Sequence, residues 1–214
     1  MNPRTLRLLA FSIALVALGA GIGTWSARWY RPQPESIEGL MWPNPKQLRT
    51  FQAIDQEGRE FGVEQLRGKW SFVFFGYTHC PDVCPVTLAV LGRVQSALDS
   101  DVPAGAPVQT VFVSVDPARD TPDQLAQYVR HFHERFIGLG GTLEQVQGLT
   151  AQLGIAFYHD APAPDGSYLV DHSASVFLLD PEARLVSIFP APQDADRILA
   201  KFRQIRSFIE QAAA

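Results

Sequence analysis

Apolar residues follow two different spacings along the chain, and each spacing predicts one kind of element. Short continuous apolar runs over residues 70–75 and 108–115 predict two buried strands. Apolar residues three to four positions apart predict helices that begin near Pro85, near Pro122 and near Asp194. Strands therefore alternate with helices through the middle of the chain, which indicates an α/β fold.

Paired strands and capped helices complete this pattern. Three pairs of short apolar segments flank turn-rich residues, as is typical of hairpins: 48–54 with 61–63, 155–159 with 167–170, and 175–180 with 184–189. Thr142 and Gln145 predict a capping box at the start of a further helix. Thr121 and Gln124 predict the same device for the helix before it.

The order of these elements indicates a thioredoxin-like fold. A strand, helix, strand and helix are followed by an inserted helix and hairpin, and then by strand, strand and helix. Right-handed crossovers make the first strands parallel, and the last hairpin adds antiparallel strands. In this fold the functional thiols lie where the first core strand enters its helix, and Cys80 and Cys84 occupy that place. We therefore predict such a domain, with an N-terminal hairpin, over residues 46–214.

An uncharged stretch lies upstream of this domain. Its 20 residues, from Leu8 to Ala27, are long enough to span a bilayer as a helix. Residues 31–45 contain four prolines and read as an extended linker. We expect an uncleaved membrane anchor over residues 1–30, and a cleaved signal peptide is the alternative.

Charge and cysteine content exclude several function classes. The formal net charge is −4, but residues 32–214 alone hold 14 basic and 22 acidic residues. A body this acidic repels phosphate backbones, so we expect no nucleic-acid partner. Two cysteines cannot form a multi-bridge secreted scaffold or a four-thiolate zinc site.

The two cysteines carry the strongest chemical signal. Cys80 and Cys84 are separated by three residues, whereas thiol-disulfide oxidoreductases use a C-x-x-C spacing. Pro85 must lie in the first helical turn because it lacks a backbone N–H, so Cys84 lies at or just before the helix N-terminus. The helix dipole favours a thiolate there. The pair can close a disulfide or bind Cu(I), which accepts two or three soft ligands.

A third ligand has to come from elsewhere, and the histidines are the candidates. His172 precedes the predicted third core strand, where the fold presents a loop that faces the thiols, and Asp171 or another acceptor can fix its tautomer. His79 adjoins Cys80, but neighbouring side chains diverge. The other histidines are interpreted as solvated surface residues: His131, His133 and His159. A lone histidine is often a packing residue, so its chemistry alone does not select the ligand.

Three segments together resemble the Sco/SenC family of membrane-anchored copper-binding proteins. They are FFGYTHCPDVCP (74–85), SVDPARDTP (114–122) and YLVDHS (168–173). The resemblance implies that Cys80, Cys84 and His172 bind a copper ion, as Cu(I) or Cu(II). His79 stands where the family often has an aromatic residue, so it either adds a weak donor or tunes the site.

The resemblance also implies a role in assembling cytochrome c oxidase. We predict a metallochaperone, not an enzyme, that delivers copper to the dinuclear copper centre of subunit II, with a copper donor and a thiol reductant as further partners. Two alternatives use the same thiols: a membrane-anchored thiol-disulfide reductase that keeps the subunit II cysteines reduced, and a thiol peroxidase or redox sensor. We expect a single-pass protein of the bacterial inner membrane with its C-terminal domain in the periplasm.

An acidic cluster follows the second predicted strand. Asp116, Asp120 and Asp123 lie among the prolines of that segment. We interpret them as turn and cap residues, and a recognition patch for a partner or a metal donor is the alternative.

Overall fold

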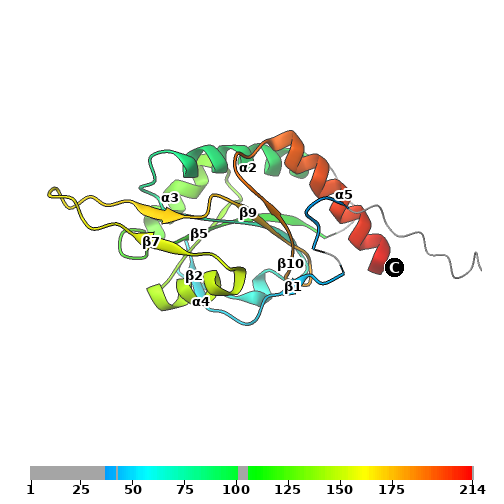
Figure 1. Cartoon of the computed structure of the whole chain (residues 1–214), viewed down its shortest axis with the longest axis horizontal. Coiled ribbons are helices and arrows are strands. Elements are labelled where there is room, and N and C mark those ends of the chain that lie inside the picture. The colour runs from blue at the N-terminus through cyan, green and yellow to red at the C-terminus, as the bar shows by residue number, and fades with distance from the viewer. Residues whose placement is uncertain (1–36, 42, 101–105, 214) are drawn as a thin grey trace, which may run out of the picture. The chain divides into compact units, whose positions relative to one another are not determined.

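The computed structural model describes residues 37–41, 43–100 and 106–213. These residues belong to one compact unit, which spans Ile37–Ala214. A mixed β-sheet with helices on both faces forms its centre (Figure 1).

Among the described residues, eight strands make up the main sheet. Their spatial order is β1 (Lys46–Gln47), β10 (Arg184–Phe189), β9 (Val176–Leu179), β4 (Trp70–Gly76), β5 (Val108–Ser114), β6 (Ile137–Gly140), β2 (Ala53–Asp55) and β3 (Glu60–Phe61). β4, β5 and β6 are parallel, whereas β9 runs antiparallel to β4 and β2 runs antiparallel to β6. This arrangement is the predicted thioredoxin-like α/β fold, including an N-terminal β2–β3 hairpin.

Helices cover both faces of the sheet. One face carries α2 (Val83–Ser100), α3 (Pro122–Phe132) and α5 (Ala195–Ala213), and the other carries α4 (Leu143–Leu153) and the short 3-10 helix η1 (Val63–Gln65) (Figure 1). Two hydrophobic clusters fill the spaces between the sheet and these layers.

Strand β4 shows why its sequence is apolar throughout. Phe72 and Phe74 pack into the cluster beneath α2 and α5, while Val73 and Phe75 pack into the cluster on the opposite face. Successive side chains of a strand point to opposite faces, so a strand covered on both sides needs apolar residues at every position. The prediction of a buried strand here is confirmed, and this rigid strand leads directly to the cysteines.

A second, two-stranded sheet lies beside the main one. It consists of β7 (Phe157–His159) and β8 (Val170–His172), which pair antiparallel with Phe157 opposite His172. The hairpin extends away from the domain, as the yellow ribbon of Figure 1 shows. The predicted second segment, 167–170, was placed too early, because strand pairing includes His172.

Some predicted boundaries of helices and strands agree with the structure, and others differ by a few residues. Both predicted capping boxes, at Thr121 and Thr142, are present. Helix α2 begins at Val83, two residues before the predicted start, and α3 ends at Phe132. The strand β6 was not predicted, because its sequence IGLG alternates glycine with apolar residues and offers little β-propensity.

The predicted membrane anchor, residues 1–30, lies outside the described residues. Within the described part of the chain, no helix has the length and apolar character needed to cross a bilayer.

Candidate metal centre

The two cysteines sit at the junction between the central strand β4 and helix α2. The chain leaves β4 at Gly76 and turns, and the backbone N–H of Cys80 donates to the carbonyl of Tyr77 (3.2 Å). Helix α2 begins at Val83, so Cys84 lies in its first turn. Pro85 follows in that turn, where the missing N–H costs nothing because the first N–H groups of a helix have no intrahelical partner.

The imidazole of His172 approaches from the β7–β8 hairpin. His172 is the last residue of β8, and not part of a free loop as the sequence suggested. Its ring packs edge-on against the rings of Phe74 and Tyr77, with centroid distances of 6.1 and 5.9 Å. Phe74 lies in β4 and Tyr77 directly follows that strand, so both aromatic neighbours of the imidazole come from the segment that leads to the cysteines.

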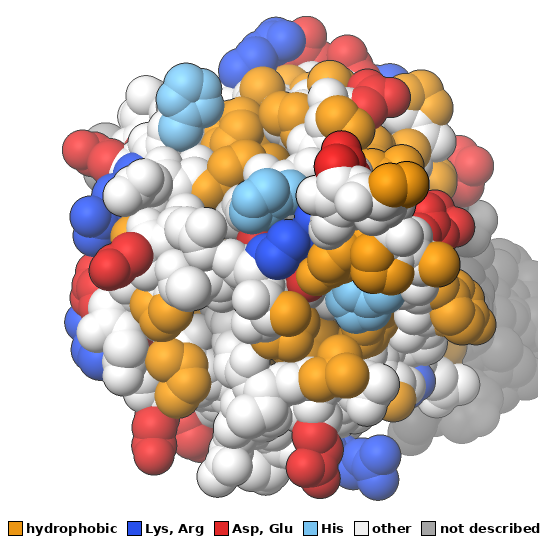
Figure 2. Space-filling model, turned by 90° about the vertical axis from the view of Figure 1, so that its left-hand side faces the viewer, with side chains coloured by type: hydrophobic (Ala, Val, Ile, Leu, Met, Phe, Trp, Pro, Cys, Tyr) orange, Lys and Arg blue, Asp and Glu red, His pale blue; other side chains and the backbone are white. Residues whose placement is uncertain are grey.

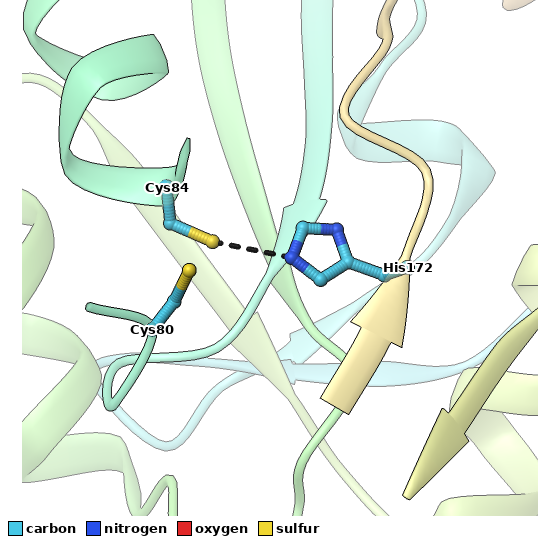
Figure 3. Close-up of side chains that lie close together, drawn as sticks. All are labelled: Cys80, Cys84 and His172. Atoms are coloured by element: carbon cyan, nitrogen blue, oxygen red, sulfur yellow. Dashed lines mark hydrogen bonds between the residues drawn. The ribbon is translucent and has the colours of Figure 1, made fainter. Parts of the chain in front are cut away.

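The structure brings the three predicted ligand residues together. One ligand atom from each of Cys80, Cys84 and His172 lies within 4.8 Å of the other two. The Sγ atom of Cys84 is 3.3 Å from Nε2 of His172, and Figure 3 shows this sulfur directed at the ring, with the sulfur of Cys80 beside it. Cys84 is buried and Cys80 is partly exposed, so the centre is reached from the side of Cys80.

A backbone contact fixes the tautomer of His172. Its Nδ1 lies 3.0 Å from the carbonyl oxygen of Ser173. A carbonyl only accepts hydrogen bonds, so Nδ1 is the protonated nitrogen and Nε2 directs its lone pair at the sulfurs. The acceptor is therefore this carbonyl and not the carboxylate of Asp171, which is exposed.

The two thiols differ in acidity. A hydrogen bond from Cys84 holds the pKa of Cys80 well below its usual value, while the same interaction and burial raise the pKa of Cys84. In the metal-free pair, Cys80 is therefore the thiol that ionises more readily, and Cys84 is the one that holds its proton more tightly. A thiolate is both the nucleophile and the metal-binding form of cysteine.

Gly76 makes room for one of the sulfurs. A Cβ atom at this position would lie 2.7 Å from Sγ of Cys84 and 2.8 Å from the ring of Phe112. Sequence reasoning missed this residue, although a glycine at the end of an otherwise large apolar strand is a signal of close approach.

Asp120 holds the loop that carries the cysteines. Its buried carboxylate accepts hydrogen bonds from the backbone N–H (3.0 Å) and hydroxyl (2.6 Å) of Thr78 and from the hydroxyl of Ser114 (2.6 Å). Asp116 is also buried, so neither is available as a recognition patch. The pair lies in the turn after β5, but its carboxylates bind the distant residues Thr78 and Tyr168 and cap no helix, so the interpretation as turn and cap residues does not describe what they do. Asp123 is an exposed residue in the first turn of α3.

The other histidines lie outside the cluster. His79 is exposed, and its Nδ1 contacts the hydroxyl of Thr78 at 3.0 Å. His131 and His159 are exposed, as predicted. The prediction for His133 is wrong: it caps α3, and its side chain is 13% exposed, with Nε2 3.6 Å from Asp99.

Apolar side chains are also exposed on this part of the domain. Figure 2 views the end that carries the β7–β8 hairpin, where hydrophobic and histidine side chains lie on the surface. Among the described residues, Tyr158 and Leu169 of the hairpin and Val86 of α2 are large apolar residues that are more than half exposed.

Known proteins share this chain's sequence and architecture. A model of the SCO1/SenC family matches residues 43–207. The mitochondrial protein SCO2 of Saccharomyces cerevisiae is 38% identical over 218 residues, which cover 97% of this chain and 72% of that protein. The mitochondrial SCO2 homolog of Bos taurus is 33% identical over 194 residues, covering 87% of this chain and 71% of that one.

Solved structures give the same result. The crystal structure of Arabidopsis thaliana ScoI with copper bound superimposes with a TM-score of 0.66 at 34% identity, covering 73% of this chain and 98% of that one. The solution structure of apo Sco1 from Thermus thermophilus reaches a TM-score of 0.69 at 33% identity, covering 82% of this chain and 98% of that one.

Proposed function

The chain belongs to the SCO1/SenC family, and we propose that it is a metallochaperone that carries copper on Cys80, Cys84 and His172. One observation carries this proposal: two sulfurs and one correctly oriented imidazole nitrogen lie within 4.8 Å of one another. The copper-bound structure of the similar Arabidopsis protein supports the choice of metal.

The chemistry of the donor set fits copper. Two thiolates and one imidazole suit Cu(I), which accepts two or three soft ligands, and imidazole also suits Cu(II). A structural zinc site needs four ligands, and no fourth metal-binding side chain joins this cluster among the described residues. When bound, copper is the cargo of the protein, and the residues only hold and release it.

The asymmetry of the thiols supports release as well as binding. Cys80 is partly exposed, so an incoming thiolate from an acceptor reaches the metal on its side and can displace it first. Cys84 and His172 keep hold of the metal from the buried side during that exchange. Uptake of copper displaces chiefly the proton of Cys84, because Cys80 has little proton to lose.

We further propose that the acceptor is the dinuclear copper centre of cytochrome c oxidase subunit II. The resemblance of three separate segments to the Sco/SenC family supports this acceptor, together with a copper donor and a thiol reductant as partners. The proposed location is the bacterial inner membrane, with the domain in the periplasm. A reductant is needed there because that compartment oxidises thiols.

A thiol-disulfide reductase that serves subunit II is the second candidate. The observation in its favour is that Cys80 is partly exposed and has a lowered pKa while Cys84 is its buried partner, an arrangement that suits attack on a disulfide. The imidazole at 3.3 Å from Cys84 favours the copper carrier, because a reductase needs no third ligand.

A transfer experiment tests the proposal. The full-length chain, reduced and in mild detergent, is titrated anaerobically with Cu(I) against a competing chelator. The loaded protein is then mixed with the reduced, metal-free copper domain of subunit II. We expect one equivalent of bound copper and its movement to the acceptor, measured as copper content after the two proteins are separated. Because a centre loaded only with Cu(I) is colourless, the visible absorption of the dinuclear centre should appear only after a one-electron oxidant is added.

Matched reactions separate the two candidates. The metal-free reduced protein is mixed with the oxidised acceptor domain, and free acceptor thiols are counted. Copper transfer that the His172→Ala variant performs poorly supports the carrier. Acceptor reduction without copper binding, unchanged in His172→Ala, would instead show a reductase.

A further inference from the structure

His172 belongs to a hairpin that, within the described part of the chain, forms no backbone hydrogen-bond ladder with the main sheet. Among the described strands, β7 and β8 pair only with each other. The cysteines, in contrast, follow β4, which pairs with a strand on each side. Three residues connect His172 to β9 of the main sheet, and beyond that connection side-chain contacts determine where the hairpin lies relative to the sulfurs.

Arg119 supplies such contacts from the loop between β5 and α3. Its Nη1 donates to the backbone carbonyl of Tyr168 (3.1 Å), and its guanidinium carbon lies 3.6 Å from the centroid of the Tyr168 ring. Nε of Arg119 donates to the carboxylate of Asp116, which also accepts a hydrogen bond of 2.8 Å from the Tyr168 hydroxyl. The ring, hydroxyl and carbonyl of Tyr168 are all engaged, two residues before β8 begins.

The same guanidinium also faces the cysteine side of the centre. Its carbon lies 5.5 Å from the centroid of the Tyr77 ring, and that ring stands edge-on to His172 at 5.9 Å. Tyr77 directly follows β4 and accepts the hydrogen bond that shapes the turn at Cys80. Arg119 therefore lies against Tyr77, which leads into the cysteine turn, and against Tyr168, which leads into the strand that carries the imidazole.

We propose that Arg119 is a positioning residue that sets the place of His172 relative to the two sulfurs, by holding Tyr168 between itself and Asp116. This inference rests on the proposed copper site, because it names the residue that aligns the third ligand. Neither Arg119 nor Asp116 belongs to the three-residue cluster itself.

The chemistry of the contact requires arginine. A planar guanidinium can stack on one ring and still donate to a carboxylate and a carbonyl, whereas a lysine ammonium is a single compact donor. The side chain is 22% exposed beside a fully buried carboxylate, and its Nη2 is buried without a hydrogen-bond partner among the described residues. Buried ion pairs contribute little net stability, so geometry explains this arrangement better than stability does.

The test compares four variants of the full-length chain: Arg119→Ala, Arg119→Lys, Tyr168→Phe and, as a matched control, Arg130→Ala. Arg130 is an exposed arginine of α3 whose ion pair is with Glu57. In the metal-free state, NMR cross-peaks between the rings of Tyr77 and His172 report the position of the imidazole. In the Cu(II)-loaded state, electron paramagnetic resonance reports nitrogen coupling, and the sulfur-to-copper absorption reports the thiolates.

In Arg119→Ala we expect the ring cross-peaks and the nitrogen coupling to be lost, while the thiolate absorption remains. Copper affinity should fall roughly tenfold, the lower end of the effect of outer-shell partners of metal ligands. Arg119→Lys should resemble Arg119→Ala, and Tyr168→Phe, which keeps the stacked ring, should show a smaller loss. Arg130→Ala should behave like the unaltered chain.

Retention of the cross-peaks and the nitrogen coupling in Arg119→Ala and Arg119→Lys would overturn the inference. If Arg119→Ala fails to fold, Arg119→Lys and Tyr168→Phe decide it by the same two signals. If the unaltered protein shows no nitrogen coupling from His172, the proposed ligand set is wrong. The cross-peaks of the metal-free protein still decide the positioning role in that case.

Discussion

The two thiols come from one short segment between β4 and α2, whereas the imidazole comes from a hairpin 88 residues farther along the chain. The thiol segment is fixed by the central sheet, by the start of a helix and by the buried carboxylate of Asp120. The hairpin is fixed through side chains, among them the rings of Phe74 and Tyr77 around His172.

The metal centre therefore has two parts that are positioned independently: a sulfur side, formed by Cys80 and Cys84, and an imidazole side, formed by His172. Local structure determines the spacing of the sulfurs, so the sulfur side is in place once β4 and α2 have formed. The third ligand depends on how the hairpin packs, and a change in that packing alters the centre from three ligands to two. We expect perturbations on the sulfur side to abolish binding and perturbations on the imidazole side to weaken it.

The largest effect is expected for Cys84→Ser. A hydroxyl is a hard, neutral donor that suits Cu(I) poorly, and the buried position of Cys84 leaves no substitute ligand. Cu(I) affinity should fall by at least about a thousandfold, or roughly 4 kcal/mol. The measurement is an anaerobic competition titration, with His79→Ala as the control that keeps the affinity of the unaltered chain. An equal loss in both variants would show that the binding site includes His79.

A smaller effect is expected for His172→Ala. The two thiolates remain in place because β4 and α2 position them without help from the hairpin. One equivalent of Cu(I) should still bind, with an affinity at least about a hundredfold lower, because losing a ligand should cost no less than losing an outer-shell partner of a ligand. His131→Ala, which changes an exposed histidine outside the cluster, is the matched control. Complete loss of binding would contradict the separation of the two sides.

The sulfurs are positioned by neighbouring residues and the imidazole by distant ones, and this explains how well the sequence predicted each of them. Cys80 and Cys84 could be placed because a buried strand, a turn and Pro85 are all adjacent to them in the sequence. The site of His172 could be proposed only with the fold and the family resemblance in hand. Nothing near His172 in the sequence shows that its ring packs against Phe74, since that contact joins distant segments.

The remaining misses also have physical causes. β6 contains two glycines in four residues, and it exists because β5 and β2 pair with it on either side. β8 extends to His172 because the residue opposite it, Phe157, continues the ladder. Pairing partners supply both pieces of information, and a single segment of sequence does not contain them.

Gly76→Ala tests the sulfur side without removing a ligand. The new Cβ would meet Sγ of Cys84 and the ring of Phe112, so one of them must move. We expect a loss of about 1–3 kcal/mol in the free energy of unfolding, as for other overpacked cores. We also expect copper affinity to fall roughly tenfold as the sulfur is displaced.

The control for this substitution is Gly148→Ala in α4, where a Cβ meets no atom within 4 Å. That change should leave copper affinity unaltered and raise stability slightly, by about 0.5–1 kcal/mol, since alanine is the better helix former. Denaturant unfolding and the Cu(I) titration measure both quantities. Unchanged affinity in Gly76→Ala would show that the ring of Phe112 moves instead of the sulfur.

The smallest expected effect is the pH dependence of alkylation of Cys80 in the metal-free protein. The hydrogen bond from Cys84 lowers the pKa of Cys80, so its thiolate persists as the pH falls from 8 to 6. The rate of alkylation by iodoacetamide should change by less than about twofold over that range, whereas an unperturbed thiol with a pKa near 8.5 slows roughly seventyfold. The rate is measured by mass spectrometry of the modified peptide.

Two variants connect this measurement to the comparison of the two sides. Cys84→Ala removes the hydrogen-bond donor that is the largest cause of the lowered pKa, so the rate should become strongly pH-dependent. His172→Ala should leave the profile nearly flat, because Nε2 of His172 has no proton to donate to Cys80 and the two sulfurs set their own ionisation. A steep profile in His172→Ala would mean that the hairpin controls the charge of the thiol pair, and the two sides would then act as one unit.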